Sequence, residues 1–189
     1  MEYFGWKTSV DSKTCVLEVI ENVTDVFELS RGISRVSDFP DDALIRMDRN
    51  FPKQIKLADQ LDNDSGLTIV STKIADAIRA LSLTDVELLP VSILDHKGND
   101  VDQHYFIVNP CTVLDCIDKE ASSLMWNPLD ENLIAGVLEL VLQEGFESDS
   151  MIFRPKHFPQ RIMVREDFVK KIEAIDASGV RFIPIDELI

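Results

Sequence analysis

The chain has 189 residues, 45% of them hydrophobic, and its 34 acidic and 19 basic residues give a formal net charge of −15 at pH 7. This balance argues against a nucleic-acid-binding protein, because contacts to phosphates need a basic face. The chain is long enough to bury a substantial core, and we expect residues 1–189 to form a single domain.

Cysteine content and hydropathy indicate the compartment. Cys15, Cys111 and Cys116 follow no recognised spacing, which favours free thiols in a reducing environment. The N-terminus lacks the basic start and apolar core of a signal peptide. The longest nearly apolar stretch, residues 133–142, is too short to span a bilayer. We therefore expect a soluble cytoplasmic protein with neither a membrane nor a nucleic acid as partner.

The first part of the chain predicts few regular elements. Residues 15–20 favour a first strand. The sequence that follows, to about residue 66, is rich in Asp, Asn, Ser, Pro and Gly, which is typical of turns and long connections. We expect residues 1–65 to form an irregular N-terminal subregion.

A repeated segment follows. Residues 67–91 and 161–185 resemble each other without a gap at an offset of 94, and each predicts a strand, a helix and a second strand. The sequence therefore predicts an α/β (α+β) fold, with a mixed β-sheet built on two strand–helix–strand units and a core over residues 66–189. Parallel and antiparallel pairing within the units both remain open.

The ends of the two helices carry recognisable signals. Ser71 is placed to cap the first helix. Gly179 is placed to end the second helix in a left-handed conformation, and Asp85 holds the equivalent position in the first copy.

The sequence between the two copies predicts further strands. Residues 88–94 and 104–108 favour a β-hairpin with Gly98 in its turn. Residues 151–154 favour a short strand, and residues 133–142 fit either a helix or a buried strand. Trp126 is a candidate interface residue, although packing in the core is the favoured interpretation.

The usual nucleotide-binding and hydrolase motifs are absent from the sequence. Residues 62–66 resemble the start of a calcium loop, but Lys73 stands where that loop needs a glutamate, so a polar turn is favoured. The Asp and His residues of segment 95–104 match no defined metal motif, and a hydrated turn is favoured there. We expect no catalytic residue, no cofactor and no metal.

Two alternatives to a binding function remain open. One is an enzyme with an acidic or cysteine site, in which Cys111 or Cys116 would need His104 or His157 as a base. Buried, unreactive thiols are the favoured interpretation of these cysteines. The other alternative is a module that binds a small ligand or assembles into an oligomer.

Four segments in fixed order resemble immunity family eleven of the bacterial polymorphic-toxin systems. They are GLTIVSTKIADAI (66–78), ELLPVSILDHKGNDVDQHYFIVNP (87–110), VLDCIDKEASS (113–123) and SMIFRPKHFPQRIMVREDFVKKIEAIDASGVRFIPI (150–185). The resemblance covers about residues 65–189 and, more weakly, the N-terminal part. It implies a strand at 138–142 and a cytoplasmic protein that neutralises a toxin encoded beside it, and it implies no catalytic residues.

We therefore expect a non-enzymatic immunity protein whose partner is a cognate toxin domain. The acidity of the chain favours a basic partner, and a homo-oligomer is left open. Because the repeated segments are interpreted as scaffold, we expect the partner-binding residues in the segments that the repeat does not share. These candidates are Asp38, Asp41, Asp42, Asp95, Asp100 and Asp102.

Overall fold

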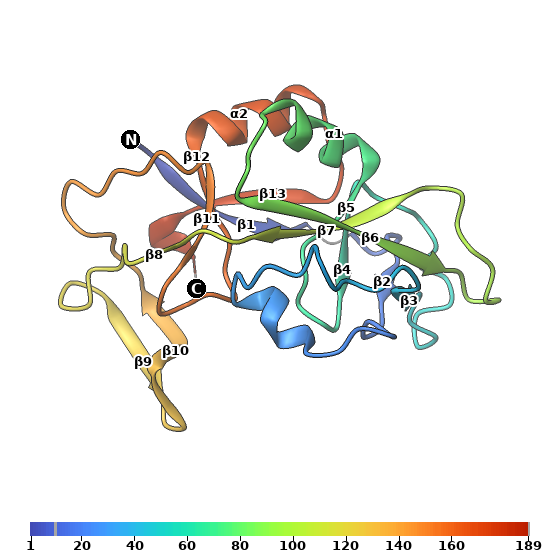
Figure 1. Ribbon diagram of the computed structural model, residues 1–189, viewed down its shortest axis with the longest axis horizontal. Helices are drawn as coiled ribbons and strands as arrows, with labels where there is room; N and C mark the ends of the chain where they lie inside the picture. Colours follow the sequence, from blue (N-terminus) through green and yellow to red (C-terminus); the bar gives the residue numbers. More distant parts are fainter. Residues whose placement is uncertain (10, 189) are drawn as a thin grey trace.

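The computed structural model describes residues 1–9 and 11–188, and these residues form a mostly β structure (Figure 1). They build thirteen strands, arranged in a five-stranded, a six-stranded and a two-stranded sheet, and two α-helices of nine residues each. The predicted α/β class is therefore wrong, because the helices are short additions to a molecule made of sheets. No helix in the described residues has the length and apolar character needed to cross a membrane.

The N-terminal strand lies in the middle of the five-stranded sheet. The order of this sheet is β13-β1-β12-β11-β8, and β1 runs antiparallel to both of its neighbours. The prediction of an irregular N-terminal subregion is thus wrong at its first residues. The bounds are β1 (Tyr3–Thr8), β8 (Val113–Leu114), β11 (Ile152–Pro155), β12 (Met163–Arg165) and β13 (Val180–Pro184).

The six-stranded sheet has the order β2-β4-β5-β7-β6-β3. Strands β6 and β7 pair in antiparallel fashion, and Gly98 in their connection has φ +84°, which confirms the predicted hairpin. Of the first strand predicted at residues 15–20, only Val16 and Leu17 are in a strand. The bounds are β2 (Val16–Leu17), β3 (Leu44–Arg46), β4 (Gln60–Asn63), β5 (Ile69–Ser71), β6 (Val86–Leu94) and β7 (Tyr105–Pro110).

The repeated segments do not form self-contained strand–helix–strand units. Helix α1 (Thr72–Ala80) follows β5 and precedes β6, and helix α2 (Glu166–Ala174) follows β12 and precedes β13. However, β7 separates β5 from β6, and β1 separates β12 from β13. Each copy therefore holds a strand from elsewhere in the chain between its own two strands. The intervening strand comes from outside each copy: β7 follows directly after the first copy, whereas β1 comes from the N-terminus, more than 150 residues before the second.

The helix ends also differ from the prediction. The left-handed residue after each helix is Ser82 in the first copy (φ 53°) and Asp176 in the second (φ 49°). Gly179 is left-handed as expected (φ 80°), but it lies beyond the helix end, where an added Cβ would overlap the carbonyl oxygen of Gln60. Ser71 makes no cap hydrogen bond, because its hydroxyl bonds the Asp59 carboxylate at 2.9 Å.

A shared core joins the two larger sheets beneath the helices, which lie side by side at the top of Figure 1. Trp6 of β1 packs against Phe168 of α2, with ring centroids 5.2 Å apart. Its indole N–H donates a 2.7 Å hydrogen bond to the Gln60 side chain of β4. Trp6 thus connects the N-terminal strand to helix α2 of the second copy and to strand β4 of the six-stranded sheet.

The two-stranded sheet projects from the body as a hairpin at the lower left of Figure 1. It consists of β9 (Ser123–Asn127) and β10 (Asp130–Glu139). The resemblance implies a strand at 138–142, and the structure confirms only its first two residues. Strand β10 ends at Glu139, and Leu142 forms a single bridge with Ile117.

Candidate functional site

The predicted acidic residues belong to two segments that meet beside strand β6. Residues 38–42 lead into β3, which pairs in parallel with the end of β6, and residues 95–102 lie in the connection from β6 to β7. Asp41 and Asp100, one from each segment, line the same surface hollow of about 280 Å³. The fold thus brings together two acidic segments that are far apart in sequence.

Asp95 stabilises the turn that carries the second segment. Its carboxylate accepts hydrogen bonds from the backbone N–H groups of Asn99 and Lys97, at 2.9 and 2.8 Å. The hydrogen bonds from the backbone and side chain of Asn99 lower the pKa of Asp95, and the N–H of Lys97 adds to this effect. The side chain of Asp95 is therefore engaged within its own turn.

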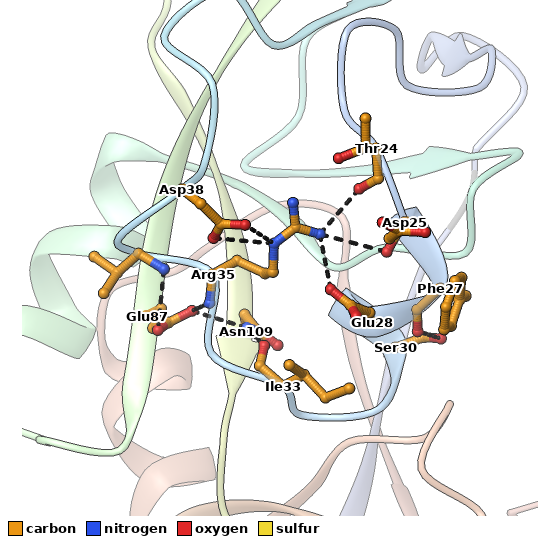
Figure 2. Close-up of polar contacts among 11 residues, drawn as sticks. Thr24, Asp25, Phe27, Glu28, Ser30, Ile33, Arg35, Asp38, Glu87 and Asn109 are labelled. Atoms are coloured by element: carbon orange, nitrogen blue, oxygen red, sulfur yellow. Dashed lines mark hydrogen bonds and ion pairs between the residues drawn. The ribbon is translucent and has the colours of Figure 1, made fainter.

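Arg35 fixes the first segment (Figure 2). Its side chain is buried, and Nε donates to both carboxylate oxygens of Asp38 at 3.1 and 3.2 Å. Nη1 bonds Glu28 Oε2 at 3.1 Å and the carbonyl oxygen of Thr24 at 2.9 Å. Asp38 is consequently paired with a buried guanidinium, which also ties the loop before β3 to Thr24 and Glu28.

Glu87 of β6 anchors the same loop from the sheet side (Figure 2). Its carboxylate accepts hydrogen bonds from the backbone N–H of Arg35 at 3.0 Å, from Asn109 Nδ2 at 2.9 Å and from the Ser34 hydroxyl. Partial burial acts to raise the pKa of Glu87, but these hydrogen bonds outweigh burial and lower it below the usual value. The loop is thus attached to the sheet through an ionised carboxylate.

The other four predicted residues are exposed, and their side chains have no hydrogen bond or ion pair with any of the described residues. Their charge is therefore uncompensated and open to a partner. We call these four residues the acidic face: Asp41, Asp42, Asp100 and Asp102.

The comparison with protein families extends over almost the whole chain. Residues 3–187 match the model described as Immunity protein family (Imm11). The chain belongs to the Imm11 family. This result confirms the resemblance noted in the sequence and extends it through the N-terminal residues. The comparison with curated proteins gives no match.

The cysteines of this Imm11 protein lie in surroundings that suppress their reactivity. Burial raises the pKa of Cys116 to about 12 and that of Cys111 to about 11, so both thiols stay protonated near pH 7. The Cys111 thiol donates a 3.6 Å hydrogen bond to the carbonyl oxygen of Asn109. These surroundings do not favour the cysteine-nucleophile alternative.

Among the described residues, neither His104 nor His157 has a hydrogen bond to a cysteine thiol. His157 Nδ1 contacts the carbonyl oxygen of Asn132 at 2.8 Å, and Nε2 lies 3.6 Å from Asp115 Oδ1. His104 is exposed beside the acidic face, where it lines the same hollow. Within the described residues, no three His, Cys, Asp or Glu side chains are grouped to hold a metal ion.

A second buried arginine, Arg154, was not identified from the sequence. Arg154 of β11 donates to the carbonyl oxygens of Leu29 (2.7 Å), Pro110 (3.2 Å) and Pro159 (2.7 Å). Burial lowers its pKa to about 10. Its place directly after three apolar residues, 151–153, was the available signal, since an arginine in a buried strand must find acceptors. This Imm11 chain therefore holds its N-terminal loop with two buried guanidinium groups.

Proposed function

We propose that this protein binds a cognate toxin domain in the cytoplasm and neutralises it without catalysing a reaction. The observation that carries the proposal is the match to an immunity protein family over residues 3–187. Neutralisation by binding requires a surface that complements the toxin, and it acts by covering the active site of the toxin or by fixing its conformation.

The acidic face supports a basic partner. Four uncompensated carboxylates on a chain of net charge −15 create a negative potential that attracts a basic surface. Attraction of this kind accelerates association and selects among partners more than it strengthens the final complex. Asp38 and Asp95 support the face from within the chain, because they hold its two segments in place.

Co-expression tests the proposed function directly. The toxin domain encoded by the adjacent gene is expressed in a bacterial host with and without this chain, and growth is measured. We expect the chain to restore growth, and the two purified proteins to bind with sub-micromolar affinity. Absence of both protection and binding would contradict the proposal.

A charge variant tests the acidic face. Replacing its four aspartates by asparagine should lower the association rate on the order of tenfold or more at low salt and weaken its salt dependence, with little change in dissociation. The matched control removes four exposed acids elsewhere: Asp64→Asn, Glu144→Gln, Glu173→Gln and Glu187→Gln. Equal effects of the two variants would show that overall charge, and not this face, attracts the toxin.

A further inference from the structure

The β9–β10 hairpin exposes large apolar side chains that the acidic face does not include. Leu129 at its tip is 95% exposed, Leu138 68% and Met125 54%, and Trp126 is 39% exposed. Large exposed apolar groups that cluster on one element are typical of contact surfaces. Figure 1 shows that the hairpin projects from the body, so a partner can reach its tip.

The most exposed apolar side chains lie on the outer face and at the tip of the hairpin. Met125 pairs with Gly136, whose missing side chain leaves room for the Met125 methyl group. Leu138 lies two residues after Gly136 and shares this outer face. Trp126 pairs with Ile134, whose side chain is buried, so Trp126 lies on the opposite face, which packs against the body. Met125, Leu138 and Leu129 at the tip therefore form one apolar surface that a partner can cover.

The opposite face of the hairpin is packed against the body. Ile134 and Val137 are buried in the core with Phe153 and Phe158. The backbone N–H of Ile134 donates a 2.7 Å hydrogen bond to the carbonyl oxygen of His157, whose ring meets the Trp126 ring edge-on at 5.7 Å. A hairpin held in this way is organised before binding, which reduces the entropy lost in a complex.

Charge distinguishes the partner from a second copy of this chain. The hairpin, residues 123–139, carries three acidic residues and no basic one, and the whole chain is strongly acidic. Two copies would repel each other, whereas a basic protein would be attracted. The β9–β10 pairing is also interrupted by three register shifts, and such irregularities discourage the addition of another strand at the edge.

We infer that the outer face and tip of the β9–β10 hairpin bind an apolar patch of the toxin that is bordered by basic residues. This inference rests on the proposed function and assigns the contact that follows electrostatic attraction. The hairpin's own acidic residues, Asp130, Glu131 and Glu139, favour a basic surface, and its exposed apolar side chains supply the contact that slows dissociation.

Two variants and a matched control test the inference. Leu129→Asp and Leu138→Asp each add one negative charge at an exposed apolar position on the hairpin, and Val19→Asp does the same at a position 58% exposed elsewhere. Binding to the purified toxin domain encoded by the adjacent gene is measured by titration calorimetry. Thermal unfolding of each variant checks that the fold is intact.

We expect the hairpin variants to bind on the order of 30-fold more weakly or worse, and Val19→Asp to bind like the wild type. Because the added charge should strengthen attraction to a basic toxin, such a loss would reflect the apolar contact. Binding within threefold of the wild type for both hairpin variants would overturn the inference and leave the proposed function intact. A wild-type chain that fails to bind would instead refute the proposed function.

Two further measurements keep the inference testable if a variant misfolds. Hydrogen–deuterium exchange of the wild-type chain should show protection of residues 123–139 when the toxin is added, and unchanged exchange there would contradict the inference. Light scattering of the wild-type chain alone should give a monomer. A dimer that Leu129→Asp dissociates would show that a second copy occupies the hairpin, which would also overturn the inference.

Discussion

The Glu87 carboxylate shows how the environment of one side chain decides its role. It accepts hydrogen bonds from three residues of a loop that lies more than 50 positions earlier in the chain, as well as from Asn109. Asp38 is held by Arg35 in the same network, whereas Asp41 has no such partner among the residues that the structure describes. The sequence identifies these residues as acidic, but the partners that hold or free each carboxylate come from distant segments.

The lowered pKa of Glu87 predicts a pH dependence of stability. The ionised carboxylate stabilises the fold above its unfolded pKa of about 4.3, and this contribution is lost as the pH falls through the lower, folded pKa. Glu87→Gln should therefore lower the free energy of unfolding by roughly 1–2 kcal/mol at pH 7, a figure reduced by solvent screening, and by much less near pH 3. Urea denaturation between pH 3 and pH 7 measures the free energy of unfolding of the wild type and of Glu87→Gln. An equal loss at pH 7 and pH 3 would contradict this account.

At the scale of elements, the two copies of the repeat agree closely in local structure and differ in their surroundings. The helices have equal length, and the left-handed residues Ser82 and Asp176 occupy equivalent positions. Gly179 has a different role, because it lies against the backbone of β4 next to Gln60. At the position equivalent to Gly179 in the first copy, Asp85 instead bonds the hydroxyls of Thr112 and Ser150.

Alanine substitutions at two glycines distinguish the stability lost to backbone strain from that lost to steric overlap. Gly179→Ala should destabilise the protein by about 2–4 kcal/mol, because the left-handed conformation disfavours a side chain and the Gln60 carbonyl leaves no room for one. Gly98→Ala has a similar φ but open space around it, so a loss of about 1 kcal/mol is expected. Chemical denaturation compares the two variants, and equal losses would show that crowding at Gly179 is unimportant.

At the scale of the whole molecule, the N-terminal residues complete both larger sheets. Strand β1 supplies the middle of the second repeat copy, and β4 pairs with β5 of the first. Leu17 and Leu61 are fully buried in a core that they share with Ile69 and Ile107. The boundary expected near residue 65 therefore crosses continuous sheets and a continuous core.

Residues 66–189 expressed alone should not fold cooperatively. Without residues 1–65, the edges of strands β5, β12 and β13 and part of the core would be exposed. Thermal unfolding followed by circular dichroism should show one sharp transition for the full chain and none for the fragment. A sharp transition for the fragment would mean that it is an independent domain and would contradict the single domain predicted for residues 1–189.

The sequence by itself determined the family resemblance, the net charge, the β6–β7 hairpin and the positions of both helices, because motifs, composition and periodicity are local properties. It could not predict the pairing of β1 between β12 and β13, which depends on residues more than 150 positions apart. Among the six candidate aspartates, only the tertiary structure decided which are engaged by partners and which remain open. It also revealed the exposed hairpin, because exposure depends on what the rest of the chain covers.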